Sequence, residues 1–104
     1  MTDFKNLADF KRRVTHMTLV KQGWYKNGQL QEMTTNPLLG IKRPVAKINT
    51  VDIMLTTRKP GSEGETVLSH LSLGKASHWS FDGDTVTKDD GHGIMQYKVE
   101  ARES

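Results

Sequence analysis

The chain has 104 residues and a net charge of +3, with 26% charged and 35% hydrophobic residues. It contains no cysteine, which excludes a disulfide framework, a thiolate metal site and a cysteine nucleophile. No apolar run approaches the roughly 20 residues that a membrane span needs, and the first residues lack the apolar core of a signal peptide. We therefore expect one cytoplasmic domain over residues 1–104 that does not enter a membrane.

The positive charge is concentrated in the first three quarters of the sequence. Residues 1–75 carry twelve Lys and Arg against six Asp and Glu, whereas residues 76–104 carry three against six. This asymmetry is able to steer a polyanion toward the N-terminal part. An ordinary solvated surface is the favoured explanation, because lysine and arginine are mostly exposed in any protein.

The segment 3–14 is expected to form a helix. Its apolar residues follow the i, i+3, i+4 spacing of one helix face, and Thr2 or Asp3 is suited to cap its start. The helix would end in a basic cluster made of Lys11, Arg12 and Arg13. Cations at a helix C-terminus are favoured by the helix dipole, so the cluster indicates helix stabilisation. Contact with phosphate groups is the functional alternative.

Period-2 alternation replaces the helical pattern after this segment and indicates a β body over about residues 16–100. Asn27-Gly28 predicts a hairpin turn, and 34–44, with two prolines and a glycine, predicts a long loop. The strongest strand region, 45–57, is broken at Asn49-Thr50, and further strands are expected at 67–73, 77–81, 85–88 and 94–99.

The expected fold is therefore α+β and mainly β: one N-terminal helix followed by five or six antiparallel strands. Strands arriving about every 10 residues favour a small barrel or a strongly curled sheet. The helix would plug one end of it. Residues 101–104 are expected to be a frayed tail.

No motif points to catalysis, to a cofactor or to a metal. The four histidines lack metal-ligand spacing, and the aspartates at 82, 84, 89 and 90 fail the spacing of a calcium-binding loop. Aspartate is also a common turn former, which explains this group. The sequence has no nucleophile elbow, phosphate-binding loop or zinc-protease motif. We expect a protein that is not an enzyme.

Aromatic and basic residues are the remaining candidates for binding. Trp24 and Tyr25 are neighbours on an expected strand and must point to opposite faces, so at most one of them is buried in a two-layer fold. The exposed ring would lie near Arg43 of the 34–44 loop and form part of a partner surface. Lys75 is a further basic neighbour of expected strands. The alternative is that the aromatic residues are the core.

Two stretches resemble small uncharacterised proteins of phages and mobile elements. The first is Leu7-Ala8-Asp9-Phe10-Lys11-Arg12, and the second runs from His70-Leu71-Ser72-Leu73-Gly74-Lys75-Ala76 to Phe81-Asp82-Gly83-Asp84-Thr85. In that group a short helix precedes a β-rich body. Gly74 stands where the group has proline, and Leu73 where it has an aromatic residue. The resemblance covers about a third of the chain and implies an accessory protein acting inside a bacterial host cell.

Two functions follow from these observations. The first is a non-enzymatic binding module whose partner is a host or phage protein. The alternative is a nucleic-acid-binding barrel that uses the basic N-terminal surface and exposed aromatic rings. The residues that would bind are, for either function, Lys11, Arg12, Arg13, Trp24, Tyr25, Arg43 and Lys75. The oligomeric state expected is a monomer or a homodimer.

Overall fold

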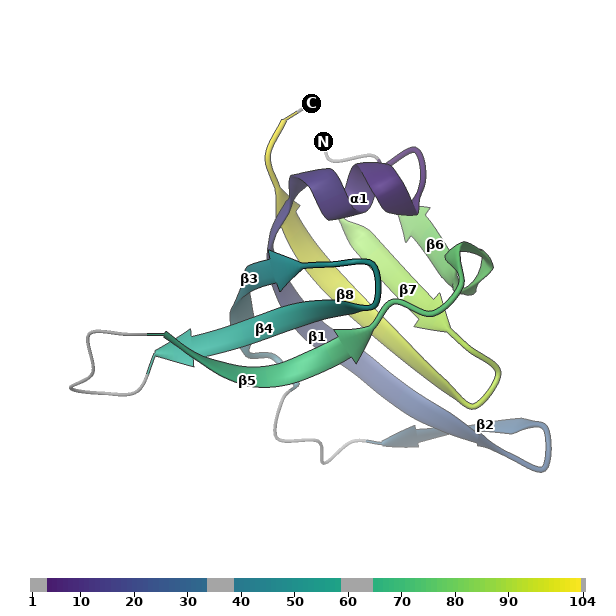
Figure 1. The fold of residues 1–104 in the computed structure, drawn as a ribbon. Coiled ribbons are helices and arrows are strands. Elements are labelled where there is room, and N and C mark those ends of the chain that lie inside the picture. The colour runs from purple at the N-terminus through teal and green to yellow at the C-terminus, as the bar shows by residue number, and fades with distance from the viewer. Residues whose placement is uncertain (1–3, 34–38, 59–64, 104) are drawn as a thin grey trace.

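The computed structural model describes residues 4–33, 39–58 and 65–103, which fold into two short helices and eight strands (Figure 1). The helices are α1 (Leu7–Arg13) and the 3₁₀-helix η1 (Ala76–His78). The strands are β1 (Val14–Lys26), β2 (Gln29–Met33), β3 (Lys42–Ile48), β4 (Asp52–Arg58), β5 (Glu65–Ser72), β6 (Trp79–Asp82), β7 (Thr85–Asp89) and β8 (Gly93–Ala101). The α+β, mainly β class is confirmed, and the expected count of five or six strands is too low.

The strands form one antiparallel sheet in the order β5-β4-β3-β1-β8-β7-β6, and β2 pairs with the far end of β1. Within the described residues β5 and β6 do not pair, so the sheet folds over on itself without closing into a barrel. The connection after β5 occupies the gap instead. The Leu73 amide donates to the Val51 carbonyl at 2.8 Å, and the Trp79 indole donates to the Leu73 carbonyl at 2.7 Å.

Helix α1 is shorter than the expected 3–14 because its capping residue is Asn6. The Asn6 side chain accepts a hydrogen bond from the Asp9 amide at 2.9 Å and so satisfies an amide that lacks a helical partner. The helix ends where the chain enters β1 directly at Val14. The basic cluster does lie in the last turn, as predicted.

Aromatic packing under α1 anchors the helix across one end of the folded sheet (Figure 1). Phe10 is fully buried and its ring lies 5.5 to 5.6 Å from the rings of Trp79 and Phe81. Phe4 meets Phe10 edge-on at 5.2 Å. The prediction that the helix plugs one end is confirmed. The core consists of Phe4, Phe10, Val14, Met17, Leu19, Ile53, Leu55, Leu71, Leu73, Trp79, Val86, Tyr97 and Val99.

Two of the expected turns are confirmed by their geometry. Asn27 and Gly28 have φ angles of 52° and 77°, the two positive values that a tight hairpin turn between β1 and β2 needs. Between β3 and β4 the Asn49 side chain accepts hydrogen bonds from the amides of Val51 and Asp52. That turn leaves Val51 exposed, although the alternation around it predicted a buried position.

The long loop predicted over 34–44 is wrong at its last three residues, 42–44. Residues 34–38 lie outside the described part, but β3 begins at Lys42 and includes Pro44. The proline is tolerated because it lies at the end of the short β1–β3 ladder, opposite His16, and the β3–β4 ladder starts only at Val45. The next strand prediction, 77–81, is shifted because the chain first forms η1.

A register shift in β1 changes which residues point inward. Leu19 pairs with Tyr97 and Lys21 pairs with Gln96. Strand β1 therefore has one more residue than β8 at this point, as in a β-bulge. Before the shift Met17 and Leu19 face the core. After it the inward positions are Gln22, opposite Met95, and Trp24, because Met95 lies two residues from the buried Tyr97 on β8.

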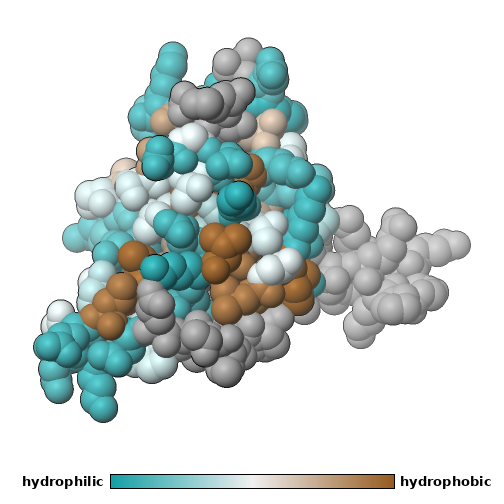
Figure 2. Space-filling model, turned by 180° about the vertical axis from the view of Figure 1, so that it is seen from behind, coloured by the Kyte–Doolittle hydropathy of each residue, from teal (hydrophilic) through white to brown (hydrophobic). Residues whose placement is uncertain are grey.

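The outer face of β1 and β2 is partly apolar. Val20 and Leu30 are among the exposed large hydrophobic side chains. Figure 2 looks at the side that carries β1 and β2 and shows apolar groups gathered over its lower part. This face therefore presents apolar side chains to solvent beside the β1–β2 hairpin.

Candidate functional site

The inner face of the folded sheet is filled at one end and open at the other. Helix α1 covers the filled end, while the β1–β2 hairpin extends from the other end (Figure 1). Two adjoining hollows lie along this open part. We call them the Arg43 hollow and the Trp24 hollow, and both are lined by Gln22 and Met95.

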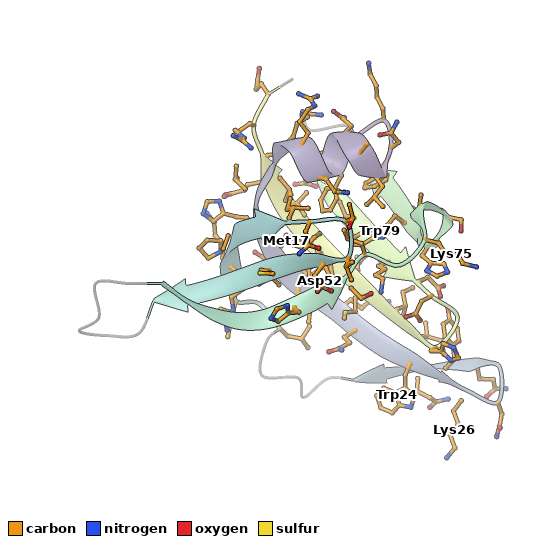
Figure 3. All side chains as sticks on the ribbon, in the orientation of Figure 1. Met17, Trp24, Lys26, Asp52, Lys75 and Trp79 are labelled. Atoms are coloured by element: carbon orange, nitrogen blue, oxygen red, sulfur yellow. The ribbon has the colours of Figure 1, made fainter. Side chains whose placement is uncertain are left out.

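The Trp24 hollow lies on the inner face of the sheet, at the end away from α1. It has a volume of about 280 Å³ and is lined by Gln22, Gly23, Trp24, Lys88, Asp90, His92, Gly93 and Met95. Figure 3 shows the Trp24 side chain at the opposite end of the molecule from α1. Trp24 is 42% exposed, whereas the other tryptophan, Trp79, is 7% exposed. A large indole that stays open to solvent inside a hollow has the character of a binding anchor.

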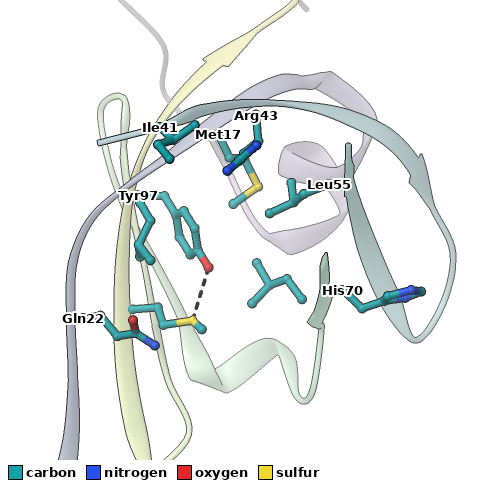
Figure 4. Close-up of a pocket in the computed structure, with 10 residues that line it drawn as sticks. Met17, Gln22, Ile41, Arg43, Leu55, His70 and Tyr97 are labelled. Carbon is teal, nitrogen blue, oxygen red and sulfur yellow. Dashed lines mark hydrogen bonds between the residues drawn. The ribbon is translucent and has the colours of Figure 1, made fainter. Parts of the chain in front are cut away.

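The Arg43 hollow lies deeper, between β1, β3, β4, β5 and β8 (Figure 4). Its volume is about 90 Å³, and it is lined by Met17, Leu19, Gln22, Ile41, Arg43, Leu55, His70, Leu71, Met95 and Tyr97. Most of these side chains are apolar. Its polar lining residues are Arg43, Tyr97, Gln22 and His70. An apolar hollow with a few polar groups is the usual form of a small binding site.

Tyr25 lies on the outer face and is not part of either hollow. Its hydroxyl donates to an Asp89 carboxylate oxygen at 2.6 Å. This hydrogen bond raises the pKa of Tyr25 above its ordinary value, because losing the proton would place two negative charges together. Of the two neighbouring rings, Trp24 is therefore the exposed one and Tyr25 links two strand ends.

The basic cluster of α1 is largely engaged within the protein. The Arg12 and Arg13 guanidinium groups bind the two carboxylate oxygens of Asp9 at 2.6 and 3.1 Å. Arg13 is buried, donates from Nε to the Arg102 carbonyl at 2.9 Å and lies over the Phe4 ring. A backbone hydrogen bond from Lys5 and the two arginines lower the pKa of Asp9. Arg13 is thus engaged inside the protein, where its side chain is 9% exposed.

The seven residues predicted to bind do not form one surface. Arg43 and Trp24 are brought together, since their hollows share lining residues on the inner face. Arg43 reaches it from strand β3 and not from an exposed loop, and the neighbouring Lys42 points outward to Glu100 at 2.8 Å. Lys75 is exposed beside η1, away from Trp24 (Figure 3). Lys11, Arg12 and Arg13 lie at the α1 end.

The aspartates near the C-terminus form turns, as predicted. One Asp90 carboxylate oxygen accepts from the amides of His92 and Gly93 at 2.9 and 2.8 Å, and Asp89 accepts from the Gly91 amide at 3.0 Å. In the described part of the chain, no group of three or more His, Asp or Glu residues is arranged to hold a metal ion.

Comparisons of this chain with protein families, curated proteins and solved structures find no match. Over residues 4–33, 39–58 and 65–103, neither helix has the length and apolarity to cross a bilayer.

The seven residues predicted to bind did not include Gln22, Met95 or Tyr97, which line the candidate site. Tyr97 and Met95 have the period-2 spacing of an inward strand face, a signal that predicts burial but not a hollow. Gln22 carries no such signal, because the register shift that turns it inward depends on pairing with β8.

Proposed function

We propose that this chain is a small non-enzymatic binding module that holds a segment of a partner protein at the open end of its inner face. The observation that carries the proposal is the exposure of Trp24 inside a hollow of a sheet whose other end is packed. Tryptophan is enriched among the residues that contribute most to protein–protein binding energy. A preorganised strand scaffold also lowers the entropic cost of binding.

The charge pattern favours a protein partner over nucleic acid. Two of the three arginine and lysine side chains in the α1 cluster bind Asp9, and Lys42 binds Glu100. A nucleic-acid surface gains most of its affinity from cations that are free to meet phosphates. In the Trp24 hollow Lys88 lies 3.8 Å from Asp90, so the charges there are mixed. The partner class consistent with the phage resemblance is a host or phage protein.

Selection from a random peptide library displayed on phage tests this proposal, with the whole protein as the immobilised target. We expect enriched peptides whose affinity falls about tenfold or more for Trp24→Ala, because the anchor is lost. Val51→Ala is the matched control, since it also removes an exposed large apolar side chain but lies in the β3–β4 turn. Peptides that bind both variants equally well would contradict the proposal.

Fluorescence anisotropy with labelled single- and double-stranded DNA and RNA at two salt concentrations tests the alternative. We expect no salt-dependent binding in the micromolar range. Binding that weakens steeply with salt would instead support a nucleic-acid function. The Lys11→Ala and Arg12→Ala variants would then show whether the α1 end is the contact surface.

A further inference from the structure

Arg43 is a partly buried residue that lines the deeper hollow, and one nitrogen of its cationic group is buried without a partner. Its Nε atom is shielded from solvent and has no hydrogen-bond partner. Figure 4 shows the guanidinium beside Met17 and across the hollow from Tyr97. A guanidinium donor withdrawn from water without an acceptor is costly, so proteins usually pair it with an anion.

The second polar group facing this hollow is also weakly paired. The Tyr97 hydroxyl donates to the Met95 sulfur at 3.2 Å (Figure 4), and a thioether is a poor acceptor. Burial raises the pKa of Tyr97 far above its ordinary value, so the hydroxyl remains a donor at neutral pH. The hollow therefore offers two donors, Arg43 and Tyr97.

Negative charge is absent from the described lining of the Arg43 hollow. Its other polar side chains are Gln22 and His70, and His70 lies at the rim, where its ring is 3.8 Å from the Asp52 carboxylate. The remaining walls are apolar. The chemistry that fits is an oxygen anion carried on a short aliphatic stem, since the anion meets the donors and the stem meets the walls.

The size of the hollow restricts what enters it. A volume of about 90 Å³ is smaller than the roughly 150 Å³ of an engineered protein cavity that binds benzene, so it suits a group of a few atoms. An acidic side chain fits this description, whereas a nucleotide or a sugar does not. Because Gln22 and Met95 line both hollows, a chain whose side chain enters the Arg43 hollow would continue over Trp24.

We propose that the Arg43 hollow receives the carboxylate of a glutamate or aspartate side chain of the bound partner, held by Arg43 and Tyr97. This inference rests on the proposed function, since the partner segment is the one anchored at Trp24. The neighbouring apolar side chains of that segment would pack on Met95 and Trp24. The partner is thus a protein with an acidic residue beside apolar residues in an exposed segment.

The same peptide selection tests this inference through a double-mutant cycle. We expect the enriched peptides to share an acidic residue next to apolar residues. Changing that residue from Glu to Gln should weaken binding to the wild-type protein about thirtyfold or more, and have little effect on binding to Arg43→Met. Tyr97→Phe should reduce the affinity about tenfold, because it removes only the hydroxyl donor.

Arg12→Met is the matched control, because it removes the same charge at the α1 end. It should leave the affinity and the Glu-to-Gln effect unchanged. Two outcomes would overturn this inference and leave the proposed function standing. In the first, the enriched peptides depend on Trp24 but share no acidic residue. In the second, changing Glu to Gln in the peptide still weakens binding to Arg43→Met. Failure to enrich any Trp24-dependent peptide would overturn both this inference and the proposed function. A further outcome is that an NMR titration shows binding of free butyrate while the selection yields no acidic peptides. The hollow would then be assigned to a small acid, and the inference about the partner would be overturned.

Discussion

Arg12 and Arg13 are adjacent, bind the same aspartate and differ in environment. The Arg13 side chain is 9% exposed and that of Arg12 is 61% exposed. We expect Arg13→Met to lower the free energy of unfolding by about 2 kcal/mol, because it breaks a buried ion pair and leaves the Arg102 carbonyl without its donor. Arg12→Met should cost less than about 0.5 kcal/mol. Urea denaturation measures both, and equal losses would contradict the structural role of Arg13.

Arg43 should be unfavourable for stability, in contrast to Arg13. Its Nε atom is buried without a partner, and replacement by an apolar side chain of similar length removes that desolvation cost. We expect Arg43→Met to raise the free energy of unfolding by about 1 kcal/mol, the pattern of a residue kept for function. Thermal and urea unfolding check this against Arg12→Met. A loss of stability would show that Arg43 is paired within the folded protein.

The β7–β8 turn carries a pH-dependent contribution to stability. Amides of Gly93 and His92 donate to the Asp90 carboxylate and lower its pKa below the ordinary value of 3.8. A carboxyl whose folded pKa is lowered stabilises the protein above its unfolded pKa, and this contribution is lost as the pH falls through the folded value.

Asp90→Asn tests this, because asparagine keeps an acceptor oxygen but does not titrate. The wild type should be the more stable protein at neutral pH. The difference in free energy of unfolding should shrink as the pH falls below the ordinary aspartate pKa of 3.8 and through the lowered pKa of folded Asp90. Chemical denaturation across this pH range measures it. A difference that stays constant with pH would show that the Asp90 charge does not contribute.

Substitutions at the two ends of the molecule should differ in their effect on the free energy of unfolding. Phe10 is fully buried where α1 meets the sheet, and Phe10→Ala should cost about 3–5 kcal/mol and detach the helix. Trp24→Ala at the open end should change the free energy of unfolding by less than about 0.5 kcal/mol, since an exposed side chain loses few contacts. Calorimetry of both variants checks this. Strong destabilisation by Trp24→Ala would mean that the indole is part of the core.

Local sequence signals predicted much of the secondary structure. The apolar spacing of 3–14 located α1, Asn27-Gly28 located the β1–β2 hairpin, and the Asp90 turn and the break at Asn49 also followed from residue type. Each of these depends on hydrogen bonds within a few residues. The errors at 34–44 and in the strand count arose where the pairing partner is distant, as for β3 between β1 and β4.

The candidate site was only partly predictable for the same reason. Trp24 and Arg43 were recognised by residue type, but Arg43 was expected on an exposed loop and not inside a hollow. Gln22, Met95 and Tyr97 join them through the pairing of β1 with β8, which are about 75 residues apart in sequence. Residue type alone does not reveal which strands become neighbours.

The class of fold, the helix, the turns and the opposite orientation of Trp24 and Tyr25 follow from the order of residues along the chain. The order of residues does not determine which of these two rings lies on the inner face. Strict alternation from Met17 and Leu19 would turn Tyr25 inward, and the register shift between Leu19 and Lys21 turns Trp24 inward instead. That shift belongs to the pairing with β8, and Phe10 of α1 packs against Trp79 and Phe81 at the other end. Both depend on contacts between distant parts of the chain, and they decide where the proposed binding surface lies.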